Sequence, residues 1–135
     1  MSDKFIINGN KLLSGEIEVR GSKNAAGPAL VASLLTKEEC VIDNLPLIED
    51  IKNTIDILKS LGVKSEWLGE RKIKLKAQDI DPAKIDFDKV SKTRISVLFF
   101  GALLAQFNRF EISAPGGDVI GLRPISVQLR ALEQL

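Results

Sequence analysis

The chain has 135 residues, 44% of them hydrophobic, which is enough apolar material for one ordinary globular core. Its net charge is +1 and no basic run stands out, so its charge does not indicate a nucleic-acid-binding protein. Histidine and tyrosine are absent, which excludes Ser-His-Asp triads, Cys-His pairs and histidine-containing zinc sites built from this chain.

The single cysteine, Cys40, excludes an internal disulfide and is typical of a small buried apolar side chain on a strand. From the opening residues we expect no signal peptide, and the apolar run over residues 95–107 is interrupted by Gln106 and too short to span a bilayer. We therefore expect a cytoplasmic protein with no membrane or nucleic-acid partner, and the sequence shows neither a metal site nor a cofactor motif.

The first part of the chain predicts strands, two helices and a hairpin. In chain order these are strands over residues 5–7 and 16–19, a buried helix over 24–35, a strand over 40–42, a helix over 48–61 and a hairpin over 63–67 and 72–76. We expect Pro28 to fall near the first turn of its helix, where a missing N–H is harmless. Gly62 is placed as a C-cap, and Ile73 and Leu75 alternate with lysines in the hairpin.

A polar connection over residues 79–88 leads into the second part of the chain. There the pattern predicts a helix over 91–107, a strand over 110–113, a glycine-rich loop over 115–124 and a last helix from about Pro124.

The second part repeats the first. Ser22 and Ser91, Leu35 and Leu104, and Pro46 and Pro115 form three pairs with the same separation along the chain. The helix ending at Leu61 matches the one ending at Leu135 at a larger separation, so residues have been added between them, in the glycine-rich loop. A repeat supplies scaffold, and a departure from it in such a loop is where function is expected.

Each repeat combines helix, strand, helix and further strands, which predicts an α/β sandwich-like unit that packs against copies of itself. The second copy lacks the hairpin that completes the first, and the chain ends inside an amphipathic helix. We expect a fragment of a longer polypeptide; a frayed natural terminus is the alternative.

Two helix starts are candidate anion sites. Ser22, Lys23 and Asn24 join a strand to a helix, where backbone N–H groups and a lysine favour phosphate or carboxylate. A capping serine with a solvated lysine would explain the same residues. Arg94 aligns with Ala25 of the first copy, and a cation near a helix start is disfavoured by the helix dipole, which points to an anionic ligand.

The glycine-rich loop is the third candidate. Gly116, Gly117 and Gly121 allow the backbone to approach a ligand closely, and Asp118 and Arg123 are its charged side chains. A loop with one acid and one cation suits a catalytic lid. A solvated turn is the simpler interpretation.

Together these motifs resemble the enolpyruvyl transferase family, in particular its members that act on a UDP-sugar. The match is carried by residues 21–26, 92–96, 115–117, 120–121 and 123–125, and residues 132–135 also fit. Each motif is weak alone, but three in this order over the whole chain are specific.

The resemblance implies a fold of two similar domains made of βαβαββ repeats, an inside-out α/β barrel that is incomplete in this chain. Residues 1–21 would be strands of the first, discontinuous domain. Residues 22–135 would be part of the second, with one complete repeat over 22–88 and the start of the next over 89–135. The implied reaction transfers the enolpyruvyl group of phosphoenolpyruvate to the 3-hydroxyl of UDP-N-acetylglucosamine, the first step of peptidoglycan synthesis. The remainder of the same polypeptide would complete the site, so we expect the 135-residue chain alone to be inactive.

Site residues follow from the resemblance position by position. Lys23 and Asn24 would contact phosphoenolpyruvate, and Arg94 would contact the sugar nucleotide. Arg123 would help to hold anionic groups of both. The residues after it would lie along the nucleotide: Pro124, Ile125, Ser126 and Val127.

Asp118 falls where the family usually has a cysteine, the proton donor to the methylene carbon and the target of fosfomycin. A carboxylic acid can deliver that proton if burial under a closed lid raises its pKa. We therefore expect Asp118 to be the proton donor and the enzyme to resist fosfomycin.

The sequence departs from the family pattern at two positions, and two alternative functions stay open. Ser126 replaces a usual aspartate and Leu122 a usually small residue. The same fold and donor serve the family members that act on shikimate 3-phosphate, although Asn24 after Lys23 favours the sugar-nucleotide members. The chain could also be an inactive, ligand-binding fragment.

Overall fold

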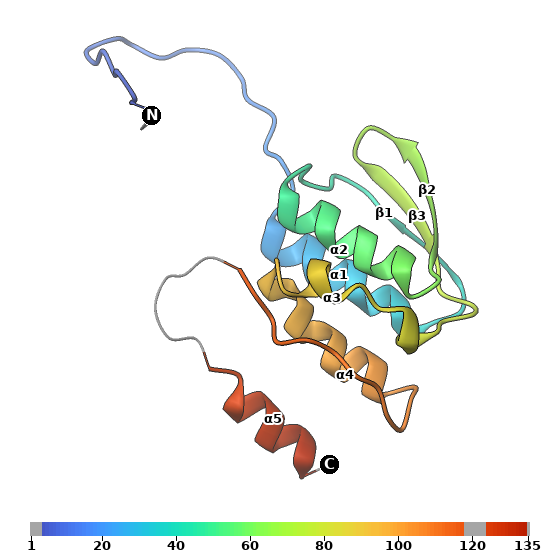
Figure 1. Cartoon of the computed structure of the whole chain (residues 1–135). Helices are drawn as coiled ribbons and strands as arrows, with labels where there is room; N and C mark the ends of the chain where they lie inside the picture. Colours follow the sequence, from blue (N-terminus) through green and yellow to red (C-terminus); the bar gives the residue numbers. More distant parts are fainter. Residues whose placement is uncertain (1–3, 118–123, 135) are drawn as a thin grey trace.

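The computed structural model describes residues 4–117 and 124–134. Its helices and strands, in chain order, are α1 (Lys23–Ala32), β1 (Glu39–Ile42), α2 (Glu49–Ser60), β2 (Lys64–Gly69), β3 (Lys72–Lys76), α3 (Phe87–Val90), α4 (Leu98–Leu104) and α5 (Ser126–Glu133) (Figure 1). Three 3-10 turns accompany them: η1 (Ser33–Leu35) after α1, η2 (Pro82–Lys84) before α3 and η3 (Arg94–Val97) before α4.

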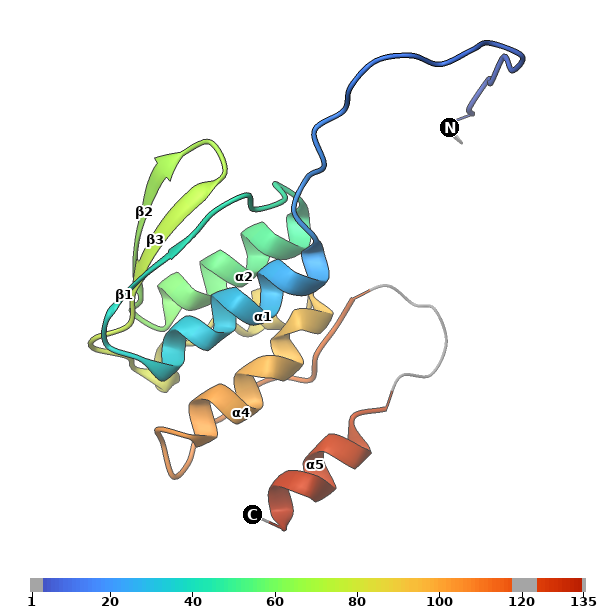
Figure 2. The same ribbon diagram turned by 180° about the vertical axis from the view of Figure 1, so that it is seen from behind.

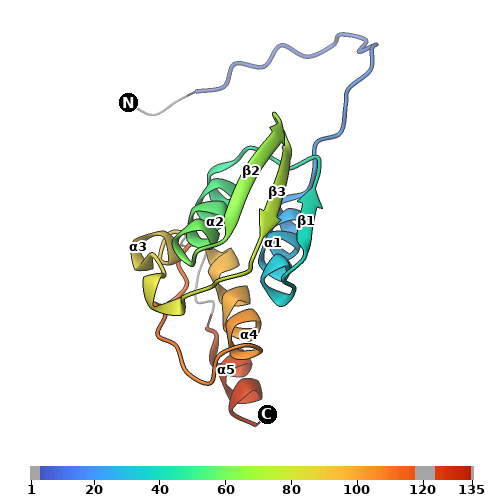
Figure 3. The ribbon, with the colours of Figure 1, turned by 90° about the vertical axis from the view of Figure 1, so that its right-hand side faces the viewer.

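The described strands form an antiparallel sheet in the order β1-β3-β2 (Figure 3). The central strand, β3, pairs with both neighbours, so that Ile73 lies opposite Ile42 on one side and Trp67 on the other. Ile73 and Leu75 are fully buried against α1 and α2, which lie behind the sheet in Figure 3. Trp67 on β2 is 43% exposed.

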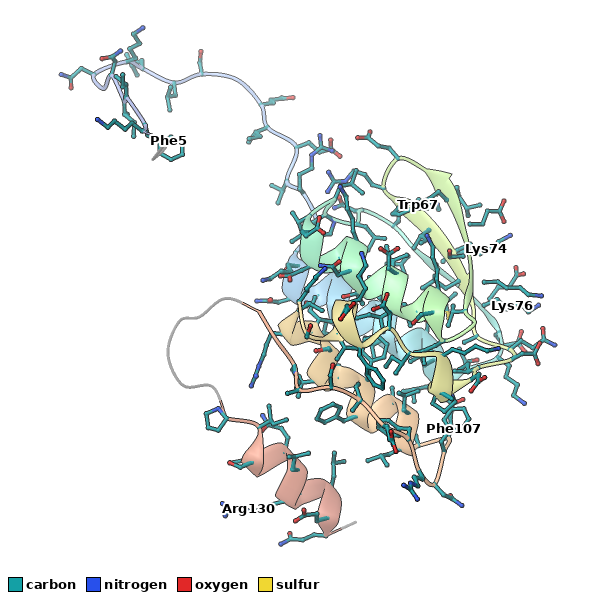
Figure 4. The ribbon with its side chains drawn as sticks, in the orientation of Figure 1. Phe5, Trp67, Lys74, Lys76, Phe107 and Arg130 are labelled. Atoms are coloured by element: carbon teal, nitrogen blue, oxygen red, sulfur yellow. The ribbon has the colours of Figure 1, made fainter. Side chains whose placement is uncertain are left out.

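The outer face of the sheet is covered with ion pairs. Lys74 and Lys76 of β3 point away from the helices (Figure 4). Lys74 Nζ lies 2.6 Å from a carboxylate oxygen of Glu66, and Lys76 Nζ lies 3.9 Å from one of Glu39. The alternation of isoleucine and leucine with lysine therefore divides β3 into a core face and a water face, as predicted.

Helix α2 confirms the prediction over residues 48–61 and shows how the helix ends. The N–H of Gly62 donates to Lys59 O at 3.0 Å, and the N–H of Val63 donates to Leu58 O at 3.0 Å. Gly62 has a φ of +100°, so these bonds form a Schellman cap that needs glycine. This cap turns the chain directly into β2.

One hydrophobic core joins the sheet, α1, α2 and α4. Its fully buried large side chains include Leu30, Leu34, Ile51, Leu58, Ile73, Leu75, Phe99 and Leu103. At the far end of α4 the side-chain amide of Gln106 donates to Leu34 O at 2.7 Å, which ties the second copy of the repeat to the first. The two copies therefore share their interior.

Three predicted strands are wrong. Residues 5–7 and 16–19 lie in an extended segment that runs away from the body of the molecule, and residues 110–113 pack along it without strand pairing (Figures 1 and 2). Phe5 and Ile17 are about nine-tenths exposed. A strand needs a hydrogen-bonded neighbour, and the described residues supply none for these segments.

Pro28 also lies elsewhere than predicted. Helix α1 begins at Lys23, so Pro28 is in its second turn, where it cannot donate to the carbonyl of Asn24. Within the described ranges, no helix is long and apolar enough to cross a membrane.

Candidate functional site

An open pocket of about 500 Å³ lies where three helices begin. Figures 1 and 2 show that α1, α2 and the η3–α4 segment all start at the same end of the molecule. The pocket is lined by Lys23, Asn24, Pro28, Asp50, Ser91, Lys92, Arg94, Ile95, Val97, Leu98 and Gly117. The structure therefore brings together Lys23, Asn24 and Arg94, three of the residues singled out in the sequence.

The start of α1 is held by direct backbone contact. The N–H of Gly21 donates to Asn44 Oδ1 at 3.2 Å, and a Cβ at Gly21 would overlap the Asn44 carbonyl oxygen. Ser22 is the N-cap residue but its side chain makes no capping hydrogen bond. The first N–H groups of α1, at Lys23 and Asn24, have no partner within the helix and belong to residues that line the pocket.

Lys23 is oriented by an acid from the neighbouring helix. Its Nζ lies 2.8 Å from Asp50 Oδ2, at the first turn of α2. Both side chains are partly exposed, at 44% and 29%, so the pair is hydrated and its net energy is small. Its effect is geometric, because it holds the ammonium group at the pocket.

Arg94 is the first residue of η3, as Lys23 is of α1. The preceding residue, Thr93, is fully buried and caps this turn, because its Oγ1 accepts from the N–H of Ile95 at 3.3 Å. Ile95 in turn packs against Gly27 of α1, where a Cβ would come within 2.9 Å of it. This close approach of α1 and η3 places the two cationic residues on one pocket.

The base of the glycine-rich loop forms one wall. Ser113 Oγ donates to Phe87 O at 3.0 Å, and a Cβ at Gly116 would overlap the Ser91 carbonyl oxygen. Gly117 has a φ of +105° and lies against Arg94. Backbone contact therefore fixes where the loop leaves the body. The predicted residues Asp118 and Arg123 lie outside the described residues.

The charges of the pocket favour an anion. Among its lining residues Lys23, Lys92 and Arg94 are positive and Asp50 is negative. Three helix starts add their partial positive charges, although η3 is short and contributes least. Cations with free helix N–H groups form a typical binding site for phosphate or carboxylate groups.

Pro124, Ile125, Ser126 and Val127 do not line this pocket. Ile125 lies on a different, largely apolar groove of about 750 Å³ between α4, the segment 110–114 and α5. Ser126 and Val127 begin α5, and Val127 is 73% exposed. The predicted contact of these four residues with the nucleotide stays a prediction.

Sequence reasoning missed Asp50 and Lys92. Asp50 looks like an ordinary acid in the first turn of an amphipathic helix, and nothing local shows that it reaches Lys23. Lys92 did carry a signal, because Ser91 and Lys92 repeat Ser22 and Lys23 at the spacing of the two copies. Within the described ranges, no group of three or more Cys, Asp or Glu side chains could hold a metal ion.

Comparison with known proteins finds the same family by a family model and by individual relatives. A family model described as EPSP synthase (3-phosphoshikimate 1-carboxyvinyltransferase) matches residues 7–135. The chain is 42% identical over 133 residues to UDP-N-acetylglucosamine 1-carboxyvinyltransferase of Campylobacter hominis, and 43% identical over 133 residues to that of Gluconobacter oxydans. Each alignment covers 98% of this chain and 32% of the relative, so the chain spans about a third of the length of these proteins.

A solved structure shares the fold. The enolpyruvyl transferase NikO from Streptomyces tendae matches with a TM-score of 0.62 and 22% identity, over 70% of this chain and 22% of that one. The chain thus has a known α+β architecture, with a small open sheet in the described residues.

Proposed function

Because the chain belongs to the EPSP synthase family of enolpyruvyl transferases, we propose that it forms part of an enzyme that moves the enolpyruvyl group of phosphoenolpyruvate to the 3-hydroxyl of UDP-N-acetylglucosamine. Phosphate is the other product, and the step would be the first of peptidoglycan synthesis. The names of the relatives support this choice of acceptor.

The observation that carries the proposal is the pocket at the three helix starts. Lys23, Asn24 and Arg94 come from two copies of the repeat, yet they line a single positively charged pocket. Both proposed substrates carry phosphate, and phosphoenolpyruvate also carries a carboxylate. A site of cations and helix N–H groups suits such ligands.

In the proposed reaction the 3-hydroxyl oxygen adds to C2 of phosphoenolpyruvate and gives up its proton to a base, while C3 receives a proton from an acid. A proton then leaves C3 as the C–O bond to phosphate breaks, so that the enol ether forms and phosphate departs. We propose Asp118 as the proton donor, Lys23 and Asn24 as ligands of phosphoenolpyruvate, and Arg94 and Arg123 as ligands of the anionic groups. The residues of 124–127 would follow the nucleotide in the complete enzyme.

Enolpyruvyl transfer to shikimate 3-phosphate is the second candidate, since the matching family model carries that description. The two candidate functions are distinguished by measuring phosphate release from phosphoenolpyruvate, catalysed by the full-length polypeptide, with each acceptor in turn. Release with UDP-N-acetylglucosamine alone supports the proposal, and release with shikimate 3-phosphate alone rejects it in favour of the second candidate. Silence with both acceptors rejects both.

We further propose that the 135-residue chain alone does not catalyse the reaction. Its pocket is open, and binding of the substrates accelerates a reaction only where the site also stabilises the transition state. Turnover by the purified chain would contradict this. An aspartate in place of a thiol also implies resistance to fosfomycin, and a stable adduct on Asp118 with loss of activity would overturn that role.

A further inference from the structure

The pocket contains a second lysine whose role the family resemblance does not assign. Lys92 lines it together with Lys23 and Arg94. Ser91 and Lys92 occupy, in the second copy of the repeat, the places that Ser22 and Lys23 occupy in the first. The fold thus places Lys23 and Lys92, which are equivalent in the two copies, on one pocket.

The two lysines differ in how their charge is compensated. Lys23 Nζ is paired with Asp50 at 2.8 Å. Across residues 4–117 and 124–134, Lys92 forms no ion pair. Its ammonium group is therefore the more available partner for a phosphate, which carries about 1.5 to 2 negative charges near neutral pH.

The backbone beneath Lys92 is well fixed although its side chain is exposed. Its N–H donates to Lys89 O at 3.1 Å, and Gly116 packs against the carbonyl of Ser91 just before it. Lys89 is itself tied to α2 through Asp56 at 3.1 Å. The Lys92 side chain can therefore reach a ligand from a backbone position that is held by hydrogen bonding and packing. Ordering this side chain costs part of its conformational entropy.

We propose that Lys92 is a further substrate-binding residue, which contacts a phosphate group of the ligand opposite Lys23. This inference rests on the proposed function. The phosphate could belong to phosphoenolpyruvate or to the sugar nucleotide, and the same chemistry would recognise either.

The test is a binding titration followed by ¹H–¹⁵N NMR, with phosphoenolpyruvate and UDP-N-acetylglucosamine as separate probes. The variants are Lys92→Ala, Lys92→Arg and, as a control, Lys37→Ala, an exposed lysine beyond the other end of α1. Lys92→Ala is expected to weaken binding of one probe by about tenfold, the scale of one charge-assisted hydrogen bond. Lys92→Arg is expected to stay within about threefold of wild type, since it keeps the charge, and Lys37→Ala to match wild type. The loss in Lys92→Ala is expected to shrink as salt screens the contact.

The outcomes separate the two proposals. If the wild-type chain binds a probe and Lys92→Ala binds it equally well, the role of Lys92 is rejected while the proposed function stands. If Lys37→Ala weakens binding as much as Lys92→Ala, the effect is general charge attraction and the inference is again rejected. If the wild-type chain binds neither probe, the role of Lys92 in this chain is rejected, and phosphate release by the full-length polypeptide decides the proposed function separately. The probe whose affinity falls identifies which phosphate Lys92 contacts.

Discussion

At the scale of single residues, the site depends on one close ion pair and on two glycines that lie against backbone carbonyl groups. Lys23 shares its pocket with Asp50, so the two must be considered as a unit. At Gly21, before α1, and at Gly116, beside the connection between α3 and η3, a Cβ would meet a carbonyl oxygen. The pocket is therefore shaped by main chain as much as by side chains.

Lys23→Ala is expected to weaken phosphoenolpyruvate binding by more than the tenfold typical of one lost contact, because it leaves the Asp50 carboxylate unpaired in the pocket. Isothermal titration of the single variant and of Lys23→Ala with Asp50→Asn measures this. The double variant should regain part of the affinity. Equal losses in both would show that Asp50 does not repel the ligand.

Gly116→Ala is expected to lower the free energy of unfolding by about 1 to 3 kcal/mol, because the new methyl group meets the Ser91 backbone and cannot be accommodated by a side-chain movement. Gly101→Ala is the matched control, since Gly101 lies in α4 with no atom near its absent Cβ. That variant should gain up to about 1 kcal/mol from helix propensity. Urea unfolding followed by circular dichroism compares the two, and a neutral Gly116→Ala would refute the contact.

At the scale of elements, α3 is attached to α2 at two points: the N–H of its N-cap residue Asp86 donates to Ser60 Oγ at 3.0 Å, and the side chain of Lys89 reaches α2. Lys89 Nζ lies 3.1 Å from Asp56 Oδ2 and 3.4 Å from the side-chain oxygen of Asn53. The hydrogen bond and charge of Asp56 raise the pKa of Lys89 above its ordinary value. Because Ser91 and Lys92 follow α3 directly, this attachment also positions one wall of the pocket.

Lys89→Met is expected to lower the melting temperature at neutral pH. A raised folded-state pKa means that the stabilisation is complete below the unfolded pKa of about 10.4 and is lost as pH rises through the higher folded value. The difference in Tm between wild type and Lys89→Met should therefore be constant from pH 7 to about pH 9 and shrink above about pH 10.5. A difference that persists unchanged at higher pH would assign the effect to packing.

Sequence patterns located α1, α2, α4, α5 and the hairpin, but they missed α3, which overlaps the end of the predicted polar connection, and they failed where an element depends on distant partners. Residues 48–61 carry a helical period and are followed by a glycine C-cap, and residues 72–76 alternate apolar with charged side chains. Residues 110–113 read as a strand because they are apolar and β-branched in part, yet pairing is a property of two segments. The same limit applies to the site: Lys23 and Arg94 were visible as cations near helix starts, but Asp50 was not.

At the scale of the whole molecule, one core connects the sheet to α4. Leu58 of α2 is fully buried within it. The pocket adjoins this core, because Ile95 lines the pocket and also packs against the core. The elements that build this core, from α1 to α4, are therefore expected to unfold as one cooperative unit.

Leu58→Ala is expected to cost about 2 to 5 kcal/mol of unfolding free energy, because it leaves a cavity at the centre of the core. Leu35→Ala, at a side chain that is 59% exposed, should cost far less. Hydrogen exchange measured at amides of both β3 and α4 should show the same loss of protection in Leu58→Ala. Loss confined to one of these elements would contradict a single core.

The position of Trp67 has a practical consequence. It is the single tryptophan of a chain without tyrosine, so it alone accounts for ultraviolet-excited emission beyond the weak signal of phenylalanine. It lies on β2, half exposed, and is not among the residues that line the pocket. Its fluorescence therefore reports on the sheet and stays silent while a ligand fills the pocket. An optical binding assay for this chain requires a tryptophan placed on purpose, and Leu98, at the pocket wall and partly exposed, is a suitable position for it.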